Sequence, residues 1–317
     1  MPEGPLGGPA AWTADQMRAS DEWVYQLTSA HIDEIDAAIA ANADTDIAML
    51  TREQFTLPTL SALLDQMRDA ILRGRGFALL RGLPVERYSE RERAMAYFGI
   101  GTYLGRAVSQ NAMGHLLGHV IDLGRTNEDF TARTYQTNAR QFFHADSCDI
   151  VGLLCVRKAK QGGESSLVSI AALYNRLLRD HPEYLGLLHR PFYYAHLGGD
   201  LPTLSPLLSF YDGKLACRYL RQYIELGHEV MGAPLSQVEI EALDIIDSIT
   251  QDPAMRIDMM LEPGDIQLAN NYMVMHSRTS FEDDEDPARY RKKLRLWLKM
   301  DNARRLAPDF PGRNGFD

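Results

Sequence analysis

The sequence is poor in cysteine, and its cysteines form no motif. Cys148, Cys155 and Cys217 are the only three, and none stands in C-x-x-C spacing. This number is too small for a disulfide framework. The sequence therefore favours a reducing compartment such as the cytoplasm, and it argues against a thiolate zinc site.

A long apolar segment and a secretory signal are also missing from the chain. No apolar run approaches the roughly 18 residues that span a bilayer. The first residues are rich in Gly and Pro, and they lack the basic and apolar regions of a signal peptide. We therefore expect a flexible lead-in and no membrane partner.

Basic residues are fewer than acidic ones. The chain has 33 Lys and Arg residues against 43 Asp and Glu residues, which gives a net charge of −10. This charge argues against nucleic acid and anionic membranes as partners. Any anionic ligand must then be bound by a local basic site. With 45% apolar and 24% charged residues, the composition is that of a soluble globular protein.

The chain of 317 residues is long enough for one large domain or two ordinary ones. We expect residues 1–56 to form a lead-in with peripheral helices. Residues 57–317 are expected to form a single domain with a helical insertion around 170–250. Many short strand-like runs alternate with turn signals, as in a β-sandwich or barrel. The sequence thus predicts a mainly β protein with helical decoration, in the α+β class.

The stretch Gln141–Asp146 contains the first candidate site residues. Its alternating aromatic character predicts a β-strand, on which His144 and Asp146 point to the same face and can bind one ion. The pattern H-x-[DE] also begins at His31 and His181, so it is weak evidence alone. His181 precedes a proline at a predicted helix start, and a solvated helix face explains His31.

Another histidine pair, His115 and His119, is four residues apart. On a helix this spacing suits a metal site, but neighbouring glycines weaken the helix and no third ligand fits. The surrounding segment, 105–140, is irregular and rich in Gly, Asn and Thr. Such a segment is more typical of a substrate loop or lid.

His276 is the candidate third metal ligand. It follows a predicted strand, Ile266–Asn271, and lies about 130 residues after Asp146, so only the fold can bring the two together. A barrel allows this, because distant strands face one lumen. Two histidines and one carboxylate form the facial triad of non-haem Fe(II) oxygenases. Taken alone, His276 fits a hydrogen-bonded core histidine better.

The stretch Arg291–Leu298 alternates between charged and apolar residues. Strand geometry places its leucines on one face and Arg291, Lys293, Arg295 and Trp297 on the other. Two interpretations stay open at this point. Either the cationic face looks into the lumen, or the strand is an exposed edge with solvated charges.

A hairpin is predicted at Asp212 and Gly213, because an Asp-Gly pair between apolar runs favours a tight turn. The following strand is expected from Leu215 to about Ile224. This assignment puts Arg218 and Arg221 on opposite faces. Solvated surface arginines are the usual explanation, and a substrate role is the alternative.

Four motifs in a fixed order resemble the TauD/TfdA family of Fe(II)/2-oxoglutarate-dependent dioxygenases, which includes taurine dioxygenase and clavaminate-synthase-like enzymes. They are His144-Ala145-Asp146, Gly162-Gly163-Glu164-Ser165, Asn270–His276 and Arg291–Arg295. The resemblance extends from about Leu57 to Met300. It implies a double-stranded β-helix, or jelly roll, in which His144, Asp146 and His276 bind iron.

The resemblance also implies a site for 2-oxoglutarate. The family's Gly-Gly-x-Thr turn supplies a hydroxyl, a role that falls on Ser165, with Ser166 as the alternative. Arg291 matches the arginine that pairs with the distal carboxylate of the cosubstrate. Arg295 matches an arginine that binds the substrate's acidic group in some members. Arg289 is a weaker candidate, since the connection after the distal histidine is longer than in some members.

The implied activity is oxidation of a small, anionic substrate by O2, while 2-oxoglutarate is converted to succinate and CO2. Hydroxylation, desaturation and cyclisation are all compatible with this chemistry. Two other classes stay open: a jelly-roll protein that binds a metal without oxygen chemistry, and a zinc hydrolase, because the same ligands suit catalytic zinc. A homo-oligomer is also compatible with the sequence.

Overall fold

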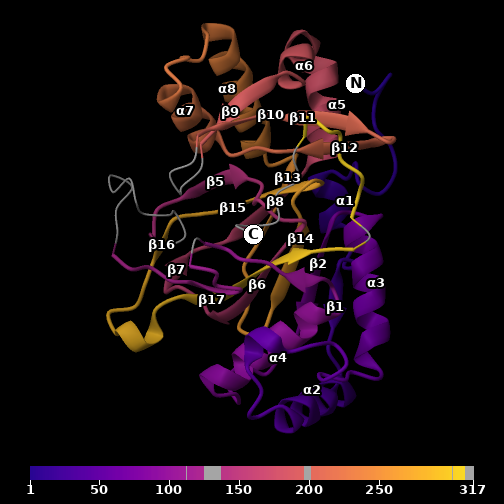
Figure 1. Cartoon of the computed structure of the whole chain (residues 1–317), viewed down its shortest axis with the longest axis vertical. Helices are drawn as coiled ribbons and strands as arrows, with labels where there is room; N and C mark the ends of the chain where they lie inside the picture. The colour runs from indigo at the N-terminus through magenta and orange to yellow at the C-terminus, as the bar shows by residue number, and fades with distance from the viewer. Residues whose placement is uncertain (112, 125–136, 196–200, 302, 311–317) are drawn as a thin grey trace.

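The computed structural model describes residues 1–111, 113–124, 137–195, 201–301 and 303–310. Its centre is built of β-strands, and helices surround this centre (Figure 1). The α-helices of the described residues are α1 (Ala14–Arg18), α2 (Ser29–Ala41), α3 (Leu60–Leu72), α4 (Glu90–Thr102), α5 (Ile170–Asp180), α6 (Pro182–Leu188), α7 (Arg221–Val230) and α8 (Gln237–Gln251). Two short 3-10 helices are η1 (Ile47–Met49) and η3 (Pro287–Arg289).

The larger central sheet joins segments from both halves of the chain. Its strands are β1 (Val24–Gln26), β2 (Phe77–Arg81), β14 (Ile266–Asn270), β6 (Ile150–Arg157), β17 (Lys292–Lys299) and β3 (Arg106–Ala107), in this spatial order. A further strand, β4 (Leu117–Val120), also pairs with β17. The pairing of β1 with β2 is parallel, and the other pairings are antiparallel.

The smaller central sheet is antiparallel and carries the histidines of the candidate site. Its strands, in spatial order, are β13 (Arg256–Met259), β8 (Ser165–Ser169), β15 (Val274–Arg278) and β5 (Gln141–His144). Three further antiparallel pairs join β9 (Pro191–Tyr194) to β10 (Thr203–Pro206), β11 (Leu208–Tyr211) to β12 (Lys214–Cys217) and β7 (Gln161–Gly162) to β16 (Phe281–Glu282).

The two central sheets pack against each other. Phe77, Val151 and Trp297 of the larger sheet share one buried apolar cluster with Leu167 and Val274 of the smaller sheet. Burying these side chains between the sheets provides the hydrophobic stabilisation that holds the sandwich closed. The predicted mainly β class with helical decoration is confirmed.

Helices cover the outer face of each sheet. Ile35 of α2, Leu64 of α3 and Tyr97 of α4 belong to the core cluster outside the larger sheet. Leu177 of α5 and Ile246 of α8 belong to the cluster outside the smaller one. In Figure 1, α5 to α8 accordingly lie at one end of the molecule, and α2 and α4 lie at the other. No helix of the described residues has the length and apolarity that a membrane crossing requires.

The orientation of β17 decides between the two interpretations of its alternating sequence. Its leucines pack in the core cluster beneath α4, on the outer face of the sheet. Arg291, at the entrance to the strand, Lys293 and Arg295 point to the other face, and they are only 3%, 2% and 7% exposed. The cationic face therefore looks into the space between the sheets, and the exposed-edge interpretation is wrong.

Short strands account for most of the differences from the predicted elements. Residues 1–56 were expected to form a lead-in with peripheral helices, but β1 lies there and joins the larger sheet beside β2. The segment 105–140 was expected to be irregular, yet β3 and β4 pair with β17. Residues 112 and 125–136 of this segment lie outside the described residues. Backbone pairing with β17, rather than any local pattern, makes β3 and β4 strands.

The predicted hairpin at Asp212 and Gly213 is confirmed, and the strand after it is shorter than expected. Both residues have positive φ, 50° and 71°, as a tight two-residue hairpin turn requires. The second strand ends at Cys217, and Arg221 already begins α7. The predicted strand to Ile224 is therefore wrong.

Gly213 and Gly264, two of the glycines with positive φ, give a matched test of backbone strain. A Cβ on Gly264, whose φ is 90°, would lie 2.0 Å from the carbonyl oxygen of Leu83, whereas a Cβ on Gly213 would meet nothing within 4 Å. We predict that Gly264→Ala lowers the free energy of unfolding by at least about 3 kcal/mol and Gly213→Ala by only about 1 kcal/mol. Urea denaturation would contradict this prediction if both variants lost the same free energy of unfolding.

Candidate active site

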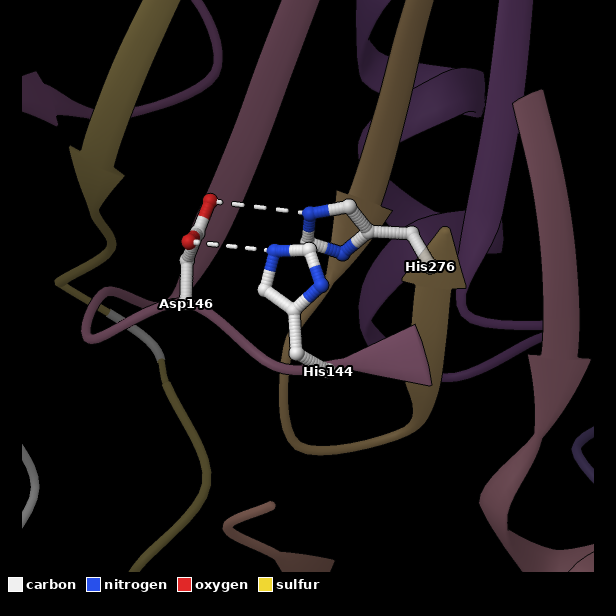
Figure 2. A group of neighbouring side chains, drawn as sticks. All are labelled: His144, Asp146 and His276. Atoms are coloured by element: carbon white, nitrogen blue, oxygen red, sulfur yellow. Dashed lines mark ion pairs between the residues drawn. The ribbon is translucent and has the colours of Figure 1, made fainter. Parts of the chain in front are cut away.

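Two strands and one loop bring His144, Asp146 and His276 together. His144 ends β5 and His276 lies directly opposite it on β15. Oδ1 of Asp146 lies 3.7 Å from Nε2 of His144, and Oδ2 of Asp146 lies 3.7 Å from Nε2 of His276 (Figure 2). The ligand atoms of the three residues all lie within 4.8 Å of one another. The predicted convergence of these residues is confirmed.

The expectation that Asp146 lies on the same strand as His144 is wrong. β5 ends at His144, and Asp146 is in the loop that follows. Its backbone N–H donates to Oδ1 of Asn271 at 2.9 Å, and Nδ2 of Asn271 donates to the carbonyl oxygen of Cys148 at 3.0 Å. Asn271 thus fixes this loop at Asp146 itself and at Cys148, two residues further on.

Hydrogen bonds also orient the ring nitrogens of His144 and the carboxylate oxygens of Asp146. Nδ1 of His144 lies 2.8 Å from the carbonyl oxygen of Phe142, and a carbonyl can only accept, so this nitrogen carries the proton. The lone pair is then on Nε2, the atom that faces Asp146. The indole Nε1 of Trp297 donates to Oδ2 of Asp146 at 3.1 Å. Such bonds fix the orientation of metal ligands.

The electrostatics suit a divalent cation. Burial, and then the neighbouring His144, lowers the pKa of His276 to about 3, so its imidazole is neutral at pH 7. Burial works against ionisation of Asp146, but His276 and Arg295 outweigh it and the pKa of the carboxyl is lowered. Two imidazoles and one carboxylate are the donor set of a facial triad. The residues present therefore fit Fe(II).

A cluster of buried cations lies next to the metal-ligand group. Ser165 on β8 is opposite Arg278 on β15, two residues beyond His276. Nζ of Lys293 is 3.5 Å from Oγ of Ser165, and the guanidinium of Arg291 lies 4.9 Å from the ring of Phe281. Ser165, Arg278 and Arg291 line the same cavity as His144, Asp146 and His276, and Lys293 adjoins it through its contact with Ser165. We call these four residues the cationic pocket.

Several polar atoms of this region have no hydrogen-bond partner among the described residues. They are Nη1 of Arg291, Nε and Nη1 of Arg278, and the amide oxygen of Gln267. Burial lowers the pKa of Arg291 to about 10 and that of Arg278 to about 9, so both are charged at pH 7. Buried donors of this kind require an anionic acceptor. The distal carboxylate of 2-oxoglutarate fits this requirement.

Arg295 lies between the metal ligands and the cationic pocket. Its Nε donates to Oε1 of Gln110 at 2.7 Å, and its guanidinium lies 4.8 Å from the ring of Trp297. Nε2 of Gln110 donates to the carbonyl oxygens of Leu116 and Arg295, both at 2.8 Å. Gln110 therefore ties the segment before β4 to the wall of the site.

Several site residues were missed by sequence reasoning. The alternation of β17 had placed Lys293 with the inward cations, yet it received no role. Arg278 lies two residues after His276, just as Asp146 lies two residues after His144. On a strand this spacing places Arg278 on the same face as His276, and it could have identified Arg278 from the sequence. Gln110 had no signal, because it lies in an irregular segment.

Other candidates lie outside the site. Arg289 has a side chain that is 72% exposed and pairs with Asp284 and Asp286. The hydroxyl of Ser166 donates to Asp258 at 2.5 Å, so Ser165 is the hydroxyl that faces the cavity. The pair His115 and His119 also lies outside the site. His119 is on β4, and Nδ1 of His115 lies 3.1 Å from the side-chain amide nitrogen of Asn111.

The two remaining arginines have structural contacts. Arg221 forms ion pairs with Glu225, Asp244 and Asp247 on α7 and α8. Arg218 follows β12, and its guanidinium lies 4.5 Å from the ring of Tyr194. The expectation that these two arginines occupy opposite faces of one strand is wrong.

The chain is similar to known oxygenases over most of its length. The family model described as "Taurine catabolism dioxygenase TauD, TfdA family" matches residues 43–297. FR-33289 synthase of Streptomyces rubellomurinus is 32% identical over 313 residues, which are 95% of this chain and 92% of that protein. Taurine hydroxylase-like protein SAT17 of Stachybotrys chartarum is 31% identical over 322 residues, 96% of this chain and 83% of that protein.

A solved structure is similar in fold. Asparagine oxygenase in complex with Fe(II), 2S,3S-3-hydroxyasparagine and succinate matches with a TM-score of 0.69 at 18% identity, over 88% of this chain and 94% of that chain. At this identity the likeness shows the shared fold alone. The predicted jelly-roll core is confirmed.

The loop contacts of Asn271 lead to a stability prediction. Asn271→Ala removes the acceptor for the Asp146 N–H and the donor to Cys148, so buried polar groups lose their partners. We predict a loss of about 2 kcal/mol in the free energy of unfolding. Asn138→Ala, at an exposed side chain, is the control and should change it by less than about 0.5 kcal/mol. The two values from urea denaturation must differ for this account to hold.

Proposed function

This chain belongs to the TauD/TfdA family of Fe(II)- and 2-oxoglutarate-dependent dioxygenases, and from that membership we propose that His144, Asp146 and His276 bind its Fe(II). The observation that carries this proposal is the approach of the His276 imidazole to His144 and Asp146 from a strand about 130 residues away. The two imidazoles and the carboxylate present the donors that the metal needs.

We further propose that Ser165 and Arg291 bind the cosubstrate. Both are buried, and both line the same cavity as the three metal ligands. Nη1 of Arg291 lacks a hydrogen-bond partner among the described residues, so it is free to donate to a bound carboxylate. Bound iron and 2-oxoglutarate together supply O2 activation, with release of succinate and CO2 and oxidation of a substrate C–H bond.

The protein's own contribution is orientation and exclusion of water. The site lies between two packed sheets, the two histidines are buried, and the Asp146 side chain is 12% exposed. Arg295, held by Gln110 beside the metal ligands, is placed to bind an acidic group of the substrate. The substrate we propose is small and anionic, and the reaction is a hydroxylation. Taurine, in the name of one relative, carries a sulfonate and matches this class.

Three further features complete the proposal. The buried, unpaired cysteines Cys148, Cys155 and Cys217 support a reducing compartment, and we propose the cytoplasm. The division of the chain near residue 57 stays a prediction. A homo-oligomeric state also stays a prediction.

The first test of this proposal is formation of succinate from 2-oxoglutarate with Fe(II) and O2. Asp146→Ala and His276→Ala should each lower the rate at least about 100-fold, since even groups that only orient metal ligands contribute about 10- to 100-fold. His119→Ala, which removes an exposed histidine on β4, should keep the wild-type rate. Turnover of an ester or amide with Zn(II), in place of succinate formation, would instead identify a hydrolase.

The second test separates substrate from cosubstrate binding. Arg295→Met should lower substrate-stimulated succinate formation about 30-fold with an anionic substrate, because a charged hydrogen bond is lost. The matched control is Arg289→Met, at an exposed arginine of η3. Substrates from sulfonate, phosphonate and amino-acid panels would be compared by KM. An unchanged KM for every accepted anion would exclude Arg295 as the binding group.

A further inference from the structure

Lys293 is a buried cation without a buried carboxylate partner. It is 2% exposed, and the hydrogen bond that the described residues give its ammonium is the one to Oγ of Ser165, at 3.5 Å. Asp265, a carboxylate that acts electrostatically on Lys293, is already engaged, because Nε and Nη2 of Arg81 each donate to it at 2.9 Å. Within the described part of the chain no carboxylate lies within ion-pair distance of Lys293.

An unpaired ammonium is costly in this position. Removing a charge from water is unfavourable unless an opposite charge or good hydrogen bonds compensate for it. Burial, with the neighbouring Arg291 adding to it, lowers the pKa of Lys293 well below its ordinary value. Buried Lys residues with perturbed titration occur often at ligand sites. The free protein therefore carries a cost that a bound anion would remove.

The strand registers place Ser165, which Lys293 contacts, two residues along the sheet from the residue opposite His276. In the smaller sheet, Leu167 lies opposite His276, and Ser165 lies opposite Arg278. Ser165 is therefore displaced from His276 by two residues along the strand direction. Two residues of a strand span about 7 Å. A five-carbon dicarboxylate with one end near the metal ligands reaches about this far. Its other end would then lie at the contact between Ser165 and Lys293.

We propose that Lys293 binds the distal carboxylate of 2-oxoglutarate together with Arg291 and Ser165. The inference rests on the proposed function and adds a third binding group to it. A carboxylate offers about four lone-pair positions, and Nη1 of Arg291, the Ser165 hydroxyl and the Lys293 ammonium fill three of them. Arg278 faces the same pocket: its Nη2 donates to the carbonyl oxygens of Thr137 and Ala139, and its Nε and Nη1, which have no partner among the described residues, are available for the remaining position.

The test compares two ligands that differ only at the distal end. 2-Oxoglutarate and 2-oxopentanoate share the keto-acid end, but the second carries a methyl group in place of the distal carboxylate. Their dissociation constants would be measured by calorimetry on the full chain with Mn(II) in place of Fe(II). Lys293→Met should weaken 2-oxoglutarate binding about 30-fold, the loss of one charged hydrogen bond, and leave 2-oxopentanoate binding within about twofold.

A neighbouring lysine provides the matched control. Lys292 is one residue away on β17, points to the other face and donates to Glu90. Lys292→Met should change neither dissociation constant, and Lys293→Arg should recover part of the 2-oxoglutarate affinity. The melting temperature of the metal-free, ligand-free Lys293→Met protein should be no lower than that of wild type, because an unpaired buried charge has been removed.

The outcomes separate this inference from the proposal on which it rests. If the wild-type protein with Mn(II) does not bind 2-oxoglutarate, the proposed function itself fails. If it binds and Lys293→Met weakens both ligands equally, or neither, Lys293 is not a cosubstrate group. A lower melting temperature with equal weakening of both ligands would identify Lys293 as a structural residue.

Discussion

The antiparallel register between β5 and β15 is the constraint on which the site depends. It sets His276 directly opposite His144, and side chains of a strand alternate between faces. A slip of one residue would bring Met275 inside and turn His276 outward. Met275 is fully buried in the cluster beneath the outer helices, so its burial opposes this slip. The apolar core outside the sheet therefore determines that His276, and not Met275, faces His144 and Asp146.

The same principle applies to β17 on the opposite sheet. Its leucines are anchored in the outer core, and this fixes Lys293 and Arg295 on the inner face together with Trp297. Each inward residue then meets a different partner across the cavity: Trp297 contacts Asp146, and Lys293 contacts Ser165. The favourable burial of the leucines on one face of the strand thus keeps the cations of the other face buried, although burying these charges is itself unfavourable.

Local patterns could predict parts of this site, but the contacts across the fold were beyond them. Alternation identified the inward set of β17, and the motif order identified His144 and His276. Ser165 and Ser166 are adjacent, and only the pairing of β8 with its neighbours shows which of them faces the cavity. Asp146 lies in a loop that Asn271 holds, a contact between residues 125 positions apart. The short strand β4 has no periodicity of its own, and it exists because β17 pairs with it.

The charge distribution explains how an acidic protein can select anions. The chain carries a net charge of −10, so its overall field repels a dianion such as 2-oxoglutarate. Arg278, Arg291 and Lys293 lie together in the interior, where charges interact much more strongly than at a solvated surface. Nonspecific anions gain little outside the cavity, because the surface is acidic and salt screens it. In the proposed site, selectivity arises from fit: an anion must reach the proposed metal ligands at one end and the buried cations at the other to recover the cost of burying those cations.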